Sequence, residues 1–186
     1  PIWSRATALA ALSDVAGGVR LLFELRQALG DRVTGFELMS APSIALSRKH
    51  HPALPNPCPG SPWYALLQID DNALDSPVAA QLERSLQAAL ESGILQDATI
   101  AQSGEQARAL WALRENIAEA QRRDGPNIKH DISVPVSVIA RFLDAAGPAL
   151  EAAFPGLRFV IFGHLGDGNL HYNLAAPEGI APAAFL

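Results

Sequence analysis

Cysteine, long apolar runs and surplus positive charge are all scarce in this sequence of 186 residues. Its single cysteine, Cys58, excludes a disulfide within the chain and is compatible with a reducing compartment. No apolar run approaches the roughly 20 residues that span a bilayer, and no signal-peptide pattern is present. With 14 Lys and Arg against 19 Asp and Glu, the net charge is -5, and no basic stripe indicates a nucleic-acid surface. We therefore expect a cytoplasmic protein, either free or peripheral at the inner face of the membrane, with no transmembrane segment and no nucleic-acid partner.

Strand and helix signals alternate along the chain. A content of 49% hydrophobic residues is enough for one sizeable core, so one domain is expected. An Ala- and Leu-rich stretch at 5–15 opens the sequence, and two successive strand-helix-strand units suggest ferredoxin-like halves. We predict an α+β fold in which a largely antiparallel sheet carries its helices on one face. The expected strands are 32–39, 62–69, 94–101 and 127–134, and the expected helices are 19–29, 76–93, 103–124 and 137–153.

The segment GHLGDGNLHYN at 163–173 predicts a β-hairpin. Its Gly-Asp and Gly-Asn pairs supply the positive φ angles of a tight turn, and strand-forming residues flank the turn on both sides. A regular register centred between Asp167 and Gly168 pairs His164 with His171 on one face of the sheet. Two imidazoles so placed either bind one metal ion or one substrate, or form a polar cross-strand pair beside the turn. The glycines can also introduce a bulge that changes this register.

Two cationic side chains lie where the surrounding pattern is unusual. Arg114 falls within the apolar stripe of the helix at 103–124 and not on its polar face. Its guanidinium either clamps a carboxylate or extends along the edge of the core. Lys129 shares one face of a strand with Asp131 and Ser133, which is either a solvated face or an anion site in which Lys129 supplies the charge.

Three motifs carry a resemblance to a known family: LWALRENIAEAQRRDG, KHDISVP and FGHLGDGNLHYN. In this order and spacing they resemble the C-terminal substrate or cap region of FAD-linked oxidases of the D-2-hydroxy-acid type. That family includes D-lactate and D-2-hydroxyglutarate dehydrogenases and the flavin subunit of glycolate oxidase. TGFELMS and PWYALLQID are similar to earlier strands of the family, so the resemblance covers nearly the whole chain. It implies that residues 1–186 are the C-terminal domain and that the FAD-binding domain belongs to the same parent chain.

The resemblance implies a two-electron oxidation of a small D-2-hydroxy acid to the 2-oxo acid, with FAD as the hydride acceptor. Arg114 and Lys129 match positions that bind substrate carboxylates, and Asn173 matches a substrate-orienting amide. His164 and His171 match histidines that bind Zn²⁺ or another divalent metal. The acid that is oxidised and the electron acceptor that reoxidises the flavin are left open.

The sequence also departs from the complete family pattern. It begins at Pro1 and stops before the downstream segment that would supply a third metal ligand and a proton-accepting histidine. No catalytic residue is therefore assigned within the chain, and we expect the isolated fragment to be inactive. Ala118 stands where hydroxyglutarate-oxidising relatives carry a threonine, so a D-lactate-like or glycolate-like substrate is expected. The alternative is an independent metal- or carboxylate-binding module without redox activity.

Overall fold

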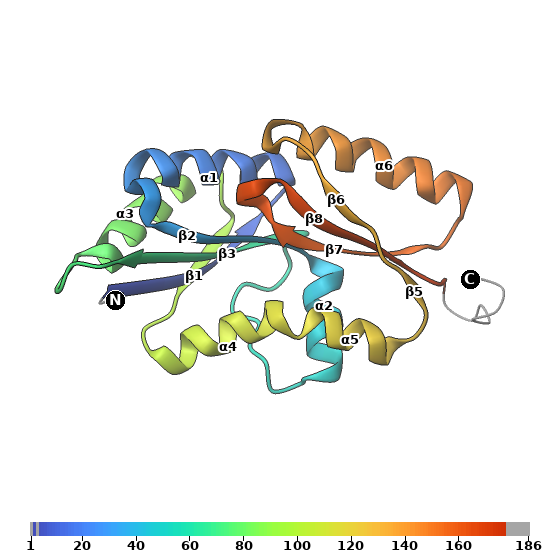
Figure 1. Ribbon diagram of the computed structural model, residues 1–186, viewed down its shortest axis with the longest axis horizontal. Helices are drawn as coiled ribbons and strands as arrows, with labels where there is room; N and C mark the ends of the chain where they lie inside the picture. Colours follow the sequence, from blue (N-terminus) through green and yellow to red (C-terminus); the bar gives the residue numbers. More distant parts are fainter. Residues whose placement is uncertain (1, 3, 178–186) are drawn as a thin grey trace.

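The computed structural model describes residues 2 and 4–177 of the chain. An antiparallel sheet of eight strands has the order β4-β1-β3-β2-β7-β8-β5, and β6 pairs with β8 outside this path (Figure 1). The predicted α+β class and antiparallel sheet are confirmed. The strands are β1 (Ser4–Leu12), β2 (Val33–Ser40), β3 (Trp63–Asp71), β4 (Asp97–Ile100), β5 (Asn127–Ile128), β6 (Asp131–Ser133), β7 (Arg158–His164) and β8 (Asn169–Ala175). The helices are α1 (Val15–Leu29), α2 (Ala41–His50), α3 (Val78–Glu91), α4 (Gly104–Glu115), α5 (Ile117–Asp124) and α6 (Ile139–Ala153).

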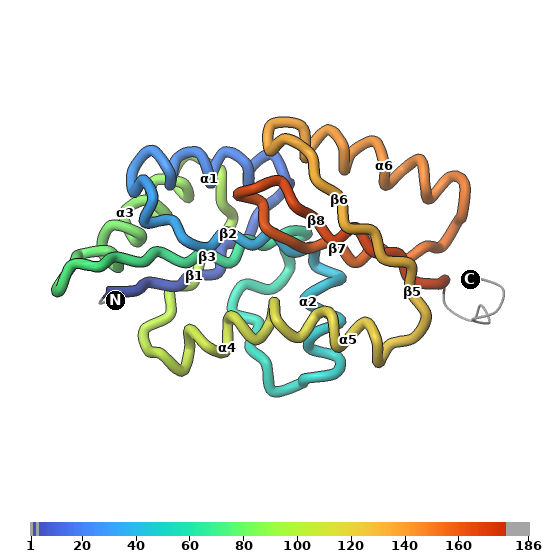
Figure 2. The backbone as a smooth tube through the Cα atoms, viewed as in Figure 1, coloured from blue at the N-terminus to red at the C-terminus, as the bar shows by residue number. Residues whose placement is uncertain are grey.

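The first half of the chain has the ferredoxin-like topology. The units β1-α1-β2 and β3-α3-β4 interleave to give the sheet order β4-β1-β3-β2, in which each pair is antiparallel. Strands β7 and β8 extend this sheet beyond β2, because β7 pairs with the second half of β2. Strands β5 and β6 form a narrow strap that runs antiparallel alongside β8 (Figure 2).

Strand β1 comes from the Ala- and Leu-rich stretch that opens the chain. Such a composition is also common in helices, so intrinsic propensity does not assign this segment. In the sheet, β1 lies between β3 and β4, and Ala8, Leu9 and Ala10 are fully buried. Tertiary packing on both faces therefore decides the conformation of this segment.

The expected placement of all helices on one face of the sheet is wrong. Helices α1, α3 and α6 cover one face, and α2, α4 and α5 cover the other (Figure 1). The reason lies in the central strands: Leu66 and Leu67 of β3 point to opposite faces, and both are fully buried. A strand that is apolar on both faces needs a helical layer on each.

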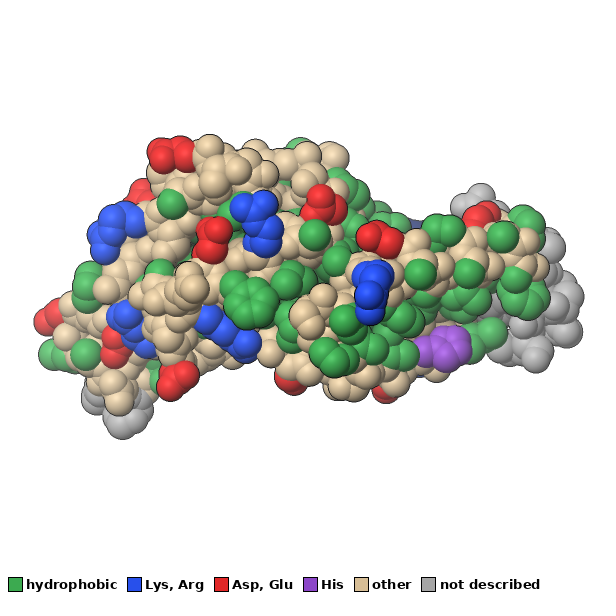
Figure 3. Space-filling view, turned by 90° about the horizontal axis from the view of Figure 1, so that it is seen from above, with side chains coloured by type: hydrophobic (Ala, Val, Ile, Leu, Met, Phe, Trp, Pro, Cys, Tyr) green, Lys and Arg blue, Asp and Glu red, His purple; other side chains and the backbone are tan. Residues whose placement is uncertain are grey.

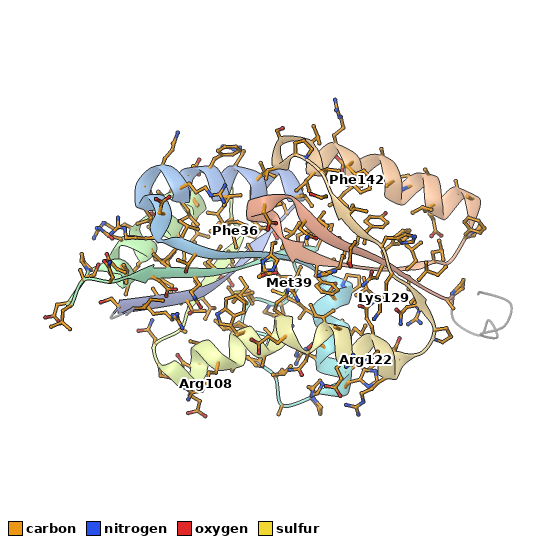
Figure 4. The ribbon with its side chains drawn as sticks, in the orientation of Figure 1. Phe36, Met39, Arg108, Arg122, Lys129 and Phe142 are labelled. Carbon is orange, nitrogen blue, oxygen red and sulfur yellow. The ribbon has the colours of Figure 1, made fainter. Side chains whose placement is uncertain are left out.

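Each helical layer has its own apolar cluster. Phe36 belongs to the cluster beneath α1 and α3, whereas Met39 packs with Leu110 and Leu113 on the side of α4 and α5 (Figure 4). Figure 3 shows the α1 and α6 layer from outside, where charged side chains are scattered among apolar ones. None of the helices in the described part of the chain is long and apolar enough to cross a membrane.

An ion cluster at the end of α5 joins three elements. Asp124 pairs with Lys49 of α2 and accepts a hydrogen bond of 2.8 Å from Arg158 of β7, and its side chain is 7% exposed. Burial opposes ionisation of Asp124, but the hydrogen bonds from Lys49 and Arg158 outweigh it and lower the pKa to about 2. The cluster thereby fixes the end of α5 against α2 and the sheet.

We predict that Asp124→Asn lowers the free energy of unfolding at pH 7 by about 2 kcal/mol, because hydrogen bonds to charged groups contribute roughly that much. A folded pKa of about 2 lies below the unfolded value of about 3.9. The stabilisation is therefore complete above the unfolded pKa and is lost as the pH falls through the folded pKa. Denaturant unfolding at neutral pH and at about pH 2.5 should show a smaller difference at the lower pH.

Asp144→Asn, at an exposed position of α6, is the matched control and should change stability by less than about 0.5 kcal/mol. A difference between wild type and Asp124→Asn that is equal at both pH values would contradict this role for Asp124.

Candidate functional site

The hairpin of β7 and β8 has a register different from the predicted one. His171 lies opposite Phe162, so the prediction that it directly opposes His164 is wrong. Gly163 and Gly168 have φ angles of 153° and 75°, and residues 165–167 form a short 3-10 helix between them. These glycine conformations lengthen the turn and move the end of β7 toward β2.

The two histidines still occupy the same side of the sheet. His164 pairs with Glu37 of β2, and Phe162 pairs with Met39, so these residues alternate onto one face. His171 joins them because it lies opposite Phe162. Helices α4 and α5 cover this face. The side chains of His164 and His171 lie at its edge and are 58% and 35% exposed.

Glu37 is a buried carboxylate at the centre of this face, with a side chain only 2% exposed. Arg114 of α4 donates from Nε to Oε2 at 2.7 Å, and Nδ1 of His164 contacts Oε1. A buried carboxylate is unfavourable unless it is paired, so these two partners stabilise its charge. Sequence reasoning did not single out Glu37. The signal was a lone glutamate between Phe36 and Leu38 in an otherwise apolar strand.

Arg114 is held from two directions. Its guanidinium lies 4.6 Å above the centre of the Phe162 ring, and that ring lies 4.7 Å from the imidazole of His171. The stacking on Phe162 adds a cation–π attraction to the hydrogen bond with Glu37. A cleft of about 290 Å³ opens beside Glu37 and His164. Phe162 and Glu37 therefore bring Arg114 into one site with both histidines.

Both imidazoles contact a carboxylate through Nδ1. His164 does so with Glu37, and His171 does so with Asp131 of β6, the residue opposite it in the strap. Because a carboxylate only accepts hydrogen bonds, Nδ1 carries the proton and Nε2 is left as a metal ligand. A carboxylate behind each histidine is the usual outer shell of protein metal sites. The two histidines thus fit Zn²⁺ or another divalent metal as partial ligands.

A complete catalytic zinc site normally has three protein ligands. Within residues 2 and 4–177, no group of three or more His, Cys, Asp and Glu side chains is placed to hold a metal ion. The described residues therefore do not form a whole site of this kind, and His164 and His171 could contribute at most two of its ligands.

Asn173 and Lys129 lie further along the same face. Asn173 is buried, with 3% of its surface exposed, and its amide bonds to the backbone of His130 and to the side chain of Gln121. Lys129 is exposed on the strap between β5 and β6 (Figure 4). The common register of β5 and β6 against β8 places Lys129 opposite Asn173. The structure thus brings all five predicted residues to one side of β7 and β8, from a helix, a hairpin and a strap.

Comparisons with known proteins show the family to which the chain belongs. The chain matches the family described as FAD linked oxidases, C-terminal domain, over residues 3–182. It is 38% identical over 150 residues to the mitochondrial D-2-hydroxyglutarate dehydrogenase of Rattus norvegicus, covering 80% of this chain and 27% of that protein. It is 33% identical over 172 residues to the mitochondrial D-2-hydroxyglutarate dehydrogenase of Arabidopsis thaliana, covering 92% of this chain and 30% of that protein. The chain spans less than a third of the length of these two relatives.

A solved structure of alkyldihydroxyacetonephosphate synthase has the same fold. It superposes with a TM-score of 0.60 at 10% sequence identity, over 95% of this chain and 37% of that chain. With the family match over nearly its whole length, the chain belongs to the FAD linked oxidases, C-terminal domain family.

We predict that Glu37→Ala destabilises the chain by about 3 kcal/mol, because it leaves Arg114, which is 15% exposed, without its buried partner. Glu115→Ala is the control: this glutamate is exposed one residue after Arg114, and its loss should change stability by less than about 0.5 kcal/mol. Urea unfolding of the three proteins measures the difference. Equal stability of the two variants would show that Glu37 has no special role in packing α4 against β2.

Proposed function

We propose that this chain is the substrate-binding part of a flavin-dependent oxidoreductase that oxidises a D-2-hydroxy acid to the 2-oxo acid. Membership of the FAD linked oxidase family supports this assignment. The observation that carries it is the placement of Arg114, held by Glu37 and Phe162 on the face that also presents His164 and His171. A planar cation beside two potential metal ligands suits an acid that carries its hydroxyl on the adjacent carbon.

Arg114 is the residue that we assign to the substrate carboxylate. Its Nε is occupied by Glu37, which leaves the two terminal nitrogens to form a bidentate pair with an anion. The contact with Phe162 fixes the plane of the guanidinium, so the geometry of that pair is set before the substrate arrives. Lys129 adds an exposed positive charge on the strap. Asn173 is proposed as the amide that orients the substrate, and the same amide bonds to the His130 N–H and to Gln121.

The cofactors of the proposed reaction are FAD and a divalent metal. FAD is assigned to another domain of the same parent chain and would accept the hydride. His164 and His171 would hold Zn²⁺ or a similar ion, which polarises the substrate hydroxyl. The described residues offer two of the three protein ligands that such a site normally has, and we assign no proton-accepting residue among them. The isolated fragment is accordingly proposed to be inactive.

A small acid such as D-lactate or glycolate is the proposed substrate. The two relatives described above are named D-2-hydroxyglutarate dehydrogenases, and their names also describe them as mitochondrial. Ala118 of α5 is exposed and has no hydroxyl to bind a second carboxylate, which favours a monocarboxylic acid. A cytoplasmic location, either free or peripheral at the inner face of the membrane, is proposed for the parent protein.

The second candidate is a metal- or carboxylate-binding module without redox activity. The exposed histidines with carboxylates behind them favour this reading as much as they favour the first. The parent gene discriminates between the two, because an FAD-binding domain encoded upstream in the same reading frame supports the flavoenzyme.

We predict that Arg114→Ala in the parent enzyme lowers kcat/KM for D-lactate by the equivalent of roughly 2–5 kcal/mol, because the substrate anion is left unpaired in a partly buried site. Arg114→Lys should also be impaired, since an ammonium group cannot form the bidentate pair. Steady-state oxidation of D-lactate, glycolate and D-2-hydroxyglutarate, with thermal unfolding of each variant, provides the measurement. Near-normal kcat/KM in Arg114→Ala, or a loss explained by unfolding, would remove Arg114 from the site.

We further predict weak zinc binding by the 186-residue chain. Structural zinc sites have apparent binding free energies of about 10–16 kcal/mol, and two imidazole ligands should give much less. Calorimetric titration with zinc should show this weak binding in wild type and none in the His164→Ala, His171→Ala double variant. His51→Ala, in the loop after α2, is the control and should bind as wild type does. Tight binding that survives the double substitution would contradict the assignment of the ligands.

A further inference from the structure

We infer that Gln121 is a positioning residue. Through the amide of Asn173 it holds the strap at residues 127–133, and so it fixes the place of Lys129. The part of this inference that concerns substrate binding by Lys129 rests on the proposed function. The part that concerns the position of the strap rests on the geometry alone. Three features carry it: the burial of two amides, the break in the strand ladder at His130, and the anchoring of α5.

The amide of Asn173 has only one consistent orientation. The backbone N–H of His130 donates to its Oδ1 at 3.2 Å, and this donor cannot change its role. Nδ2 of Asn173 must then face Gln121, and it donates to Oε1 of that residue at 3.0 Å. Both side chains are buried, with 3% of each residue exposed, so the bond between the two amides is shielded from water. Gln121, Asn173 and the His130 N–H thus form a polarised chain with a single arrangement of donors and acceptors.

This chain supports the strap where the backbone ladder is interrupted. β5 ends at Ile128 and β6 begins at Asp131, so Lys129 and His130 lie between two short strands that both pair with β8. The His130 carbonyl accepts from the backbone N–H of Tyr172 at 2.8 Å, whereas its own N–H is bound by the Asn173 side chain. The side chain of Asn173 therefore replaces a backbone partner at the residue next to Lys129.

Gln121 is itself fixed to the rest of the fold. It lies in α5, whose last residue, Asp124, is bound by Lys49 and Arg158. Its backbone carbonyl also accepts from Nδ2 of Asn127, the first residue of the strap, at 3.3 Å. Gln121 thus contacts the strap directly at its start and through Asn173 at its centre. A shift of the Gln121 side chain should therefore change the position of the strap at Lys129, which lies between these two contacts.

The consequence concerns Lys129, an exposed side chain whose own contacts do not fix it. The backbone on either side sets the Cα position of Lys129. His130, the next residue, is held by the bond of its N–H to Asn173. If Gln121 is replaced by an apolar residue, Asn173 loses an acceptor and the His130 N–H is released more often. Lys129 then samples a wider region, and the charge it contributes to the proposed carboxylate site is less well placed.

The test begins with amide hydrogen exchange on the 186-residue chain. Gln121→Met, similar in length but without an acceptor, should raise the exchange rate of the His130 amide about tenfold, which corresponds to the loss of one net hydrogen bond. Gln121→Glu keeps an acceptor toward Asn173 and should exchange more slowly than Gln121→Met. Arg122→Met, at the exposed neighbouring position of α5, is the matched control and should leave the rate unchanged (Figure 4). If Gln121→Met does not fold, Gln121→Ala replaces it, since it removes the acceptor without adding bulk.

The second measurement uses the parent enzyme. Gln121→Met should raise KM for D-lactate about threefold with little change in kcat, and it should have no further effect when Lys129 is already alanine. Absence of activity in the wild-type enzyme would remove the proposed function but would leave the exchange result to decide the role of Gln121. An unchanged His130 exchange rate in folded Gln121→Met, or a KM effect that persists in the Lys129→Ala background, would overturn the inference.

Discussion

The carboxylate of Glu37 is the interaction on which the candidate site depends. Glu37 lies between apolar residues of β2. Its side chain is buried between α4 and the end of β7, where it contacts Arg114 and His164. Because an unpaired charge there would be strongly unfavourable, Arg114 and His164 must both be in place when the fold is complete. The same bond that neutralises Glu37 takes Nε of Arg114, and its two terminal nitrogens make no hydrogen bond to another of the described residues. A requirement of folding thus also fixes the group that we propose for recognising an anion.

The architecture explains why residues so distant in sequence meet on one face. Central strands that are apolar on both sides require two helical layers, and the second layer brings α4 and α5 beneath β7 and β8. The strap pairs along β8 and places Asp131 beside His171. A neighbour from another element thereby supports four of the candidate side chains, those of Arg114, His164, His171 and Asn173. Such support favours side chains held in one arrangement, as a binding site for a small acid requires.

Much of this could be read from the sequence, and the misses have physical causes. The alternating elements, the hairpin and the unusual position of Arg114 follow from local patterns of turn residues and apolar spacing. The register of the hairpin did not, because Gly163 and Gly168 adopt φ angles that a regular two-strand model does not contain. The second helical layer was missed although the apolar run of β3 pointed to burial on both faces. Glu37 and Gln121 were missed because a polar residue within an apolar stretch reveals its partner only in three dimensions.

The central claim is that this face of the chain binds the carboxylate of a 2-hydroxy acid. Titration of D-lactate into the 15N-labelled 186-residue chain, followed by NMR, tests it most directly. We predict that the largest shift changes occur at the Arg114 Nε–H and at the backbone amides of Lys129 and His171. The changes at these two backbone amides should disappear in Arg114→Ala. A larger cavity, of about 680 Å³, lies elsewhere, between the loop that contains Pro55 and the start of α4. Shift changes concentrated at that cavity, or unchanged in Arg114→Ala, would contradict the account.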